Sequence, residues 1–236
     1  MGRAFEFRRE RKEKRWDKMA KTFTKYGKLI AMAVKASGPD PENNPKLRAI
    51  IANAKSENMP KDRIENAIHR ASSKDASSFS EVVYEGYGPH GVAILIETAT
   101  DNPTRTVANV RMHFNRGGGE LGKTGSLDFI FNRKGVFKVH ASADRLEEME
   151  LDLIDFGLEE IYSDAEELVI ITAFQDFGTM QKALEDKKIE VRSAQLQRIP
   201  TTTKSLTPEQ EEEVLDLVDK FEQDDDVSAV YHNIAN

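Results

Sequence analysis

The spacing of apolar residues changes once along the chain, and this change limits most strongly what the chain can fold into. Apolar positions recur every three or four residues over 16–34, 45–57 and 61–71, which predicts three amphipathic helices. The serine-rich stretch 72–80 has little to bury and predicts a linker. Beyond it the period falls to two, which is typical of strands. Residues 1–75 are therefore predicted to form a three-helix domain, with α/β structure after it.

The α/β part is predicted to contain two domains, one inserted in the other. A helix capped by Thr207, Pro208 and Gln210, and a strand over 227–233, cannot bury their faces alone at the end of the chain. We therefore predict that they return to complete one domain, formed by 80–132 plus 204–236. The other elements predicted for this domain are strands at Val82–Tyr87, Val92–Ala99 and Leu127–Phe131 and a helix at 103–115.

The intervening segment 134–199 follows the order strand, helix, strand, strand, helix, strand, which is typical of a ferredoxin-like unit. Asp144 and Glu147 are predicted to form a capping pair where its first helix starts. The predicted fold class is α+β, with a three-helix domain followed by two α/β domains, the second inserted in the first. The predicted strands are Val136–His140, Glu160–Tyr162, Leu168–Ala173 and Glu190–Arg198, and the helices are 144–156 and 177–187.

Composition excludes several classes of protein. Cysteine is absent, which rules out disulfides, thiolate zinc sites and cysteine nucleophiles. No apolar run approaches the roughly 18 residues of a membrane span, and the basic N-terminus is not followed by the apolar segment of a secretory signal. The five histidines show no metal-ligand spacing. We expect a cytoplasmic protein that binds no membrane, no metal and no other cofactor.

Charge is divided unevenly along the chain. The net charge is −7, yet residues 1–75 hold 19 Lys and Arg against 10 Asp and Glu, a balance of +9. The remaining residues hold 15 against 31, a balance of −16. Such an asymmetry indicates that a polyanion binds at the N-terminal end. Nucleic acid is the expected partner.

The strongest candidate for phosphate contact is the run from Arg8 to Arg15, in which six of eight residues are basic and none is apolar. Lysines continue the positive charge along the next turns of the same predicted helix. A basic stripe ahead of a packed helix is typical of phosphate-backbone binding. The alternative is a solvated helix extension with internal Glu–Lys pairs. The predicted contacts are Arg8, Arg9, Arg11, Lys12, Lys14, Arg15, Lys18, Lys21, Lys25 and Lys28.

The second and third predicted helices have the spacing of a helix-turn-helix. Asp62 and Glu65 share the exposed face of the second of these with basic residues, and they would repel phosphates, which favours a plain αα-hairpin. The plausible readers of base edges on that face are Lys61, Arg63, Asn66 and Arg70. Further candidates for nucleic-acid contact are Arg105 and Arg111 on the helix predicted at 103–115.

The segment from Gly117 to Thr124 matches the phosphate-loop pattern G-x-x-x-x-G-K-T. That chemistry requires a strand before the loop and a helix after it, so that amides at a helix N-terminus face the phosphates. Here a helix is predicted before the loop and a strand after it, which favours a glycine-rich connection over a nucleotide site. No Ser/His/Asp arrangement is placed by the sequence, and no catalytic residue is predicted.

Several motifs together resemble the YebC family over nearly the whole chain. They are M-P-K-D at 59–62, Y-E-G-Y-G-P-H-G at 84–91, T-D-N at 100–102, R-T-V-A-N-V-R at 105–111, G-G-x-L-G-x-x-G-S at 118–126 and D-D-V-x-x-V-Y at 225–231. The resemblance implies a helical N-terminal domain, two α/β domains and no catalytic residue. It also implies a cytoplasmic regulator of transcription, with relatives that include a mitochondrial translational activator and bacterial proteins tied to relief of ribosome stalling.

Two functions stay open, both without catalysis. One is a translation factor that relieves stalled elongation by binding ribosomal RNA or tRNA, while its acidic domains meet basic ribosomal proteins. The other is a transcriptional regulator that binds duplex DNA. A duplex reader usually presents a clean basic helix and two-fold symmetry, and this chain offers a mixed-charge helix and no evident dimerisation surface. We favour RNA and a monomer, and keep an NTP-dependent enzyme as a remote alternative.

Overall fold

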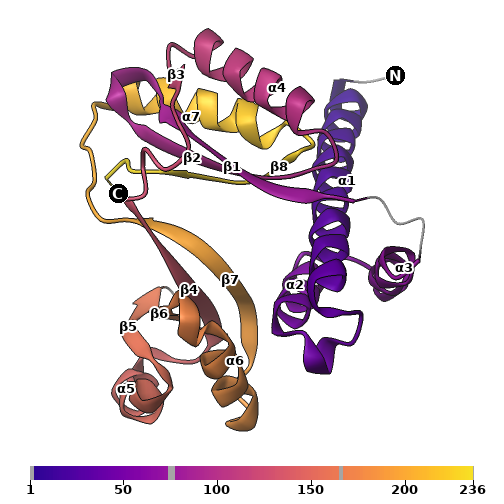
Figure 1. Cartoon of the computed structure of the whole chain (residues 1–236), viewed down its shortest axis with the longest axis vertical. Helices are drawn as coiled ribbons and strands as arrows, with labels where there is room; N and C mark the ends of the chain where they lie inside the picture. The colour runs from indigo at the N-terminus through magenta and orange to yellow at the C-terminus, as the bar shows by residue number, and fades with distance from the viewer. Residues whose placement is uncertain (1–2, 74–77, 165–166, 236) are drawn as a thin grey trace.

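The first helix is the longest element, and it runs beside the central domain before it reaches the other two helices of its own domain (Figure 1). The third part of the molecule, the insert, lies below the central domain in this view, with α2 facing its strand β7. The computed structural model describes residues 3–73, 78–164 and 167–235, and it describes side chains from Met19 onward apart from that of Ala143.

The helical domain is built on the predicted amphipathic pattern. Tyr26, Ile30 and Val34 of the first helix pack against Leu47 of the second and Ile64 of the third in one apolar core. The first helix is longer than predicted, since the basic run contains neither Gly nor Pro and continues it toward the N-terminus. The helices are α1 (Arg3–Ser37), α2 (Pro45–Ser56) and α3 (Lys61–Ala71), with a 3-10 turn, η1 (Pro41–Asn43), before α2.

The central domain is a four-stranded sheet with two helices on one face (Figure 1). Its strand order is β3-β1-β2-β8, so the C-terminal strand lies next to β2. Phe114 of α4 and Phe221 of α7 pack on Ile94 and Ile96 of β2. The elements are β1 (Ser80–Tyr87), η2 (Pro89–Gly91), β2 (Ala93–Thr100), α4 (Pro103–Arg116), β3 (Glu120–Leu121), α7 (Pro208–Glu222) and β8 (Val227–His232).

The predicted strand Leu127–Phe131 is wrong. Residues 124–130 form turns, and a strand begins only at Phe131. Leu127 and Ile130 are buried with Ala93 of β2, on the second face of the central sheet. A short apolar run can cover a sheet from a turn as well as it can join one, because both arrangements remove the same side chains from water.

Two predicted helix starts have different outcomes. Thr207 and Gln210 form a reciprocal capping box at the start of α7, as predicted. The predicted capping pair of Asp144 and Glu147 is wrong, because the helix begins at Leu146 without a side-chain cap. Asp144 lies in the short 3-10 turn that precedes this helix.

The insert has the strand order β5-β6-β4-β7 with every neighbouring pair antiparallel, as in a ferredoxin-like unit. Phe131 of β4 lies opposite Pro200 of β7, so the chain enters and leaves the insert at one place. This arrangement confirms the predicted α+β fold class. The elements are β4 (Phe131–His140), η3 (Ala143–Arg145), α5 (Leu146–Leu153), η4 (Ile154–Phe156), β5 (Leu158–Asp164), β6 (Glu167–Ala173), η5 (Phe174–Asp176), α6 (Phe177–Asp186) and β7 (Val191–Pro200).

Asn53 of α2 fastens the helical domain to the insert. Its Nδ2 donates to the backbone carbonyl of Ala194 in β7 at 2.7 Å, and its Oδ1 accepts the backbone N–H of Ala194 at 2.9 Å. Asn53 is 6% exposed, and β7 is an edge strand. The side-chain amide therefore supplies the pair of hydrogen bonds that a further strand would make, and it covers the edge.

Replacing Asn53 with alanine should lower the free energy of unfolding by roughly 2–6 kcal/mol, because a buried N–H and a buried C=O would each lose a partner at about 1–3 kcal/mol. The midpoint of urea denaturation measures this loss. Asn66→Ala, at an exposed position of α3, is the matched control and should change the stability by less than about 0.5 kcal/mol. An unchanged midpoint for Asn53→Ala would show that water reaches the β7 edge.

Candidate nucleic-acid interface

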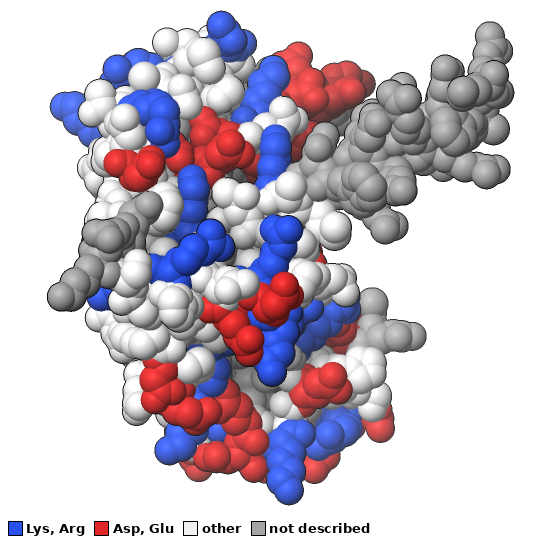
Figure 2. All heavy atoms as spheres, turned by 90° about the vertical axis from the view of Figure 1, so that its right-hand side faces the viewer, with Lys and Arg blue, Asp and Glu red and all other residues white. Residues whose placement is uncertain are grey.

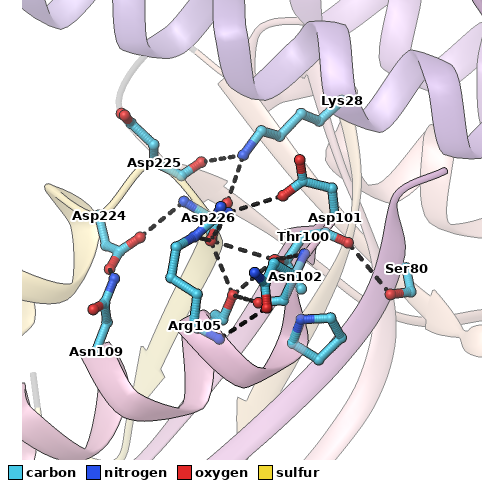
Figure 3. A network of polar contacts seen from close by, with 12 residues as sticks. Lys28, Ser80, Thr100, Asp101, Asn102, Arg105, Asn109, Asp224, Asp225 and Asp226 are labelled. Carbon is cyan, nitrogen blue, oxygen red and sulfur yellow. Dashed lines mark hydrogen bonds and ion pairs between the residues drawn. The ribbon is translucent and has the colours of Figure 1, made fainter. Parts of the chain in front are cut away.

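A buried carboxylate lies where α1, α4 and the turn before β8 meet. Asp226 is 4% exposed. From α1, the Nζ of Lys28 donates to its Oδ1 at 2.9 Å. From α4, the Nη2 of Arg105 donates to its Oδ2 at 2.7 Å, and the hydroxyl of Thr106 donates to the same oxygen at 2.9 Å (Figure 3). Three elements that are far apart in the sequence are thus joined at one side chain.

Neighbouring side chains fix the elements that supply these donors. Asn102 caps α4, where its Oδ1 accepts the backbone N–H of Arg105 at 3.1 Å. Asp224 shapes the turn, since its Oδ1 accepts the backbone N–H of Asp226 at 2.9 Å and its Oδ2 accepts a hydrogen bond from Asn109 of α4 at 3.0 Å (Figure 3). The start of α4 and the turn before β8 are therefore held together as one polar unit.

The pKa of Asp226 reflects these contacts. Burial by itself raises the pKa of this carboxyl, but hydrogen bonds from Lys28, Arg105 and Thr106 and the charge of Lys28 outweigh burial and lower the pKa to about 2. The hydrogen bond to Asp226 in turn raises the pKa of Arg105. Asp226 is therefore ionised at neutral pH, and its negative charge is met by cations of the same chain.

Two predicted nucleic-acid contacts, Lys28 and Arg105, belong to this unit. Besides its bond to Asp226, Lys28 donates to the backbone carbonyl of Asp225 at 2.8 Å. Arg105 also pairs with Asp101 at 2.9 Å. Both side chains are therefore bound within the chain: Lys28 joins α1 to the central domain, and Arg105 joins α4 to the turn before β8.

Two further lysines of the predicted basic stripe lie against the same end of the central domain. The Nζ of Lys21 donates to the backbone carbonyl of Gln223 at 3.2 Å. Lys25 is half-buried, and this burial lowers its pKa although Glu222 acts in the opposite direction. The structure therefore brings the described lysines of the stripe to the contact between α1 and the central domain, where Lys25 and Lys28 are half-buried and Lys21 stays exposed.

The remaining candidates lie on other surfaces. Lys61 pairs with Glu65 at 3.5 Å on the exposed face of α3. Arg63, also exposed on α3, lies 6.0 Å from the ring centroid of Phe23 in α1. Arg111 is exposed on α4. The side chains of Arg8, Arg9, Arg11, Lys12, Lys14, Arg15 and Lys18 lie outside the described residues.

The glycine-rich loop surrounds a carboxylate of its own chain. Glu85 of β1 is 3% exposed, and its two oxygens accept the backbone N–H groups of Gly125 at 2.9 Å and of Leu127 at 2.6 Å. The backbone carbonyl of Glu85 accepts the N–H of Gly122 at 2.7 Å. A helix, α4, precedes this loop and turns follow it. The Glu85 carboxylate is therefore held by amides that directly follow the phosphate-loop match, and Gly122 of the match is bound to the backbone of the same residue.

The described ranges hold neither a metal-binding cluster nor a membrane-spanning helix. Within them, no group of three or more His, Asp or Glu side chains is placed to hold a metal ion. None of the described helices combines the length and the apolar character needed to cross a membrane.

Fold and site together define a class of three-part α+β proteins, in which a basic helical domain is joined by ion pairs to an acidic two-sheet body. Residues 3–74 match the family described as TACO1/YebC protein N-terminal domain, and residues 79–234 match TACO1/YebC second and third domain. The chain therefore belongs to the TACO1/YebC family, which confirms the resemblance found in the sequence motifs.

Relatives match the chain from end to end. A "probable transcriptional regulatory protein" of Cytophaga hutchinsonii is 60% identical over 235 residues, which cover 100% of this chain and 99% of the relative. A protein of Parabacteroides distasonis with the same name is 53% identical and covers 99% of this chain and 97% of its own length. The crystal structure of a conserved hypothetical protein from Aquifex aeolicus has a TM-score of 0.79 at 34% identity, covering 92% of this chain and 90% of that one.

The protein should release no phosphate from ATP or GTP, because turns and not a helix follow the loop, and the amides of Gly122, Gly125 and Leu127 are already bound to Glu85. Lys123, exposed in the loop, should tolerate alanine without loss of nucleic-acid binding. Glu85→Gln should instead lower stability by roughly 1–3 kcal/mol, since one amide N–H would then face a donor. A phosphate-release assay and thermal unfolding measure the two effects. Turnover that disappears in Lys123→Ala would contradict the assignment of this loop.

Asp226→Asn should destabilise the protein at pH 7 by roughly 2–3 kcal/mol. This lies between the stabilities contributed by exposed and by fully buried ion pairs, because Asp226 is buried but Arg105 is half-exposed. The pKa of Asp226 is lowered from 3.8 to about 2, so its contribution is complete above about pH 4 and is lost as the pH falls through about 2. Thermal unfolding of both proteins from pH 7 to pH 2 should therefore show a difference that narrows in acid. Asp216→Asn, at an exposed site of α7, is the control, and an equal effect of both substitutions would contradict the role of Asp226.

Proposed function

We propose that this protein is a regulator of gene expression that binds nucleic acid through its N-terminal helical domain and catalyses no reaction. The observation that carries the proposal is the balance of +9 in residues 1–75 against −16 in the rest of the chain. Lys and Arg recur from the top to the bottom of the face in Figure 2, with acidic residues between them. The relatives named as transcriptional regulatory proteins support the same broad class of function.

RNA is the favoured partner, and the protein would act as a translation factor that relieves stalled elongation on ribosomal RNA or tRNA. The exposed face of α3 mixes Lys61 and Arg63 with Asp62 and Glu65, which suits contact with a folded RNA better than readout of a DNA major groove. The acidic domains suit basic ribosomal proteins. We expect a monomer in the cytoplasm.

A transcriptional regulator that binds duplex DNA is the second candidate, and relatives that are named transcriptional regulatory proteins favour it. Co-sedimentation separates the two. Protein that pellets with ribosomes at physiological salt and leaves no footprint on duplex DNA would support the translation factor. A tight, sequence-dependent footprint without ribosome binding would support the transcriptional regulator instead.

Removing residues 1–15 should reduce the salt dependence of binding, because the six basic residues from Arg8 to Arg15 would each release close to one counterion on binding. The slope of log affinity against log salt should become shallower by roughly four to five on duplex DNA, at about 0.9 per contact and with about five of the six residues in contact. Binding to all sequences should weaken alike, since phosphate contacts position the protein and do not read bases. Fluorescence anisotropy across a salt series measures the slope.

The control for this deletion is Lys134→Gln with Lys138→Gln, which removes two cations that are paired with Glu159 and Asp164 in the insert. This control should leave the slope unchanged. A deletion variant that keeps the affinity and the slope of the full chain would show that the run is a solvated helix end.

A further inference from the structure

A groove between α1 and α3 brings together two aromatic rings and two arginines. Phe23 of α1 and Phe79, just before β1, line it together with Arg63 and Arg70 of α3. Both arginines are exposed, and neither forms an ion pair with an acid among the described residues. These two cations of the helical domain therefore differ from Lys28 and the other cations that face internal carboxylates.

Small residues leave unfilled space at the base of the groove. Gly27 of α1 and Ala67 of α3 line it, and a Cβ added at Gly27 would meet no atom within 4 Å. Small residues at facing positions leave space between two helices, where large side chains would close it. The groove lined by both aromatic residues therefore has open space next to α1.

Phe79 has no evident role in the folded cores. It is half-buried, and it packs into none of the apolar clusters formed by the described residues. Its ring lies 5.5 Å from the Nζ of Lys28, which Asp226 holds in place. An aromatic ring at a surface next to cations can contribute stacking energy to a ligand.

We propose that this groove binds an unpaired nucleotide, with its base stacked on Phe79 or Phe23 and the flanking phosphates on Arg63 and Arg70. Aromatic rings stack on bases whose faces are free, whereas a duplex covers both faces of every internal base. The proposal rests on the proposed nucleic-acid function and adds that the preferred target is single-stranded. It also assigns the contact to the described part of α3, separately from the basic run in residues 8–15.

The test uses the full chain with a labelled, unstructured 12-nucleotide strand, as RNA and as DNA, and with the matching duplex of each. Phe79→Leu keeps an apolar side chain but removes the ring, and it should weaken single-strand binding roughly tenfold while leaving duplex binding unchanged. Phe79→Trp should retain single-strand binding. Arg63→Gln with Arg70→Gln should make the single-strand salt slope shallower by about 1.4, since each phosphate contact contributes about 0.7.

The matched control is Lys46→Gln with Lys55→Gln, which removes the same charge from α2, outside the groove. It should change single-strand affinity much less than the arginine pair does. Equal losses for the two double variants, or single-strand binding by Phe79→Leu that matches the unmodified chain, would overturn the groove proposal while the nucleic-acid function stands. An unmodified chain that binds neither strands nor duplexes would overturn both.

Discussion

The position of the helical domain on the central domain depends on the charge of Asp226. This carboxylate is almost inaccessible to water, so its ionised form is stable only while Lys28 and Arg105 remain beside it. The dependence is mutual. The side chain of Lys28 is only 14% exposed, and without the negative charge of Asp226 it would be a buried cation with no counter-charge. Since Lys28 lies on α1, this contact sets the direction of α1 and hence the place of α3 and its arginines relative to the sheet.

This joint divides the cations of the basic domain into two groups with different uses. Lys21, Lys25 and Lys28 lie against the turn before β8, where carbonyls and carboxylates of the chain are close. Arg63 and Arg70 lie on the exposed part of α3, beside aromatic rings. A phosphate can compete for a cation only where no internal acid has already bound it. The net charge shows which domain binds a polyanion, but the ion pairs within the chain decide which face of that domain can bind a phosphate.

The fold could be predicted from the sequence wherever the signal is local. Periods of three to four and of two identified the helices and strands, and their order identified the ferredoxin-like unit. The run Leu127–Phe131 was wrongly predicted to be a strand, because its apolar residues are buried by a turn that packs on the sheet. The site was less predictable, since Lys28 and Asp226 are separated by 198 positions. The acidic triplet at 224–226 was visible in the sequence, but nothing in it identifies α1 as its partner.

Buried acids bind donors in or directly beside both patterns that suggested phosphate binding in the sequence. The Glu85 carboxylate accepts the two amides that follow the glycine-rich pattern, and Asp226 accepts Lys28 and Arg105. A carboxylate and a phosphate present the same kind of anionic oxygen to an N–H donor, so the donors alone cannot distinguish an internal anion from a ligand. Here the anion is internal, because the two carboxylates that these donors bind are only 3% and 4% exposed. The donors that bind Glu85 and Asp226 are not available to a ligand. The exposed arginines of α3, which lie beside the aromatic rings of the groove, are therefore the part of the described surface best suited to a nucleic acid.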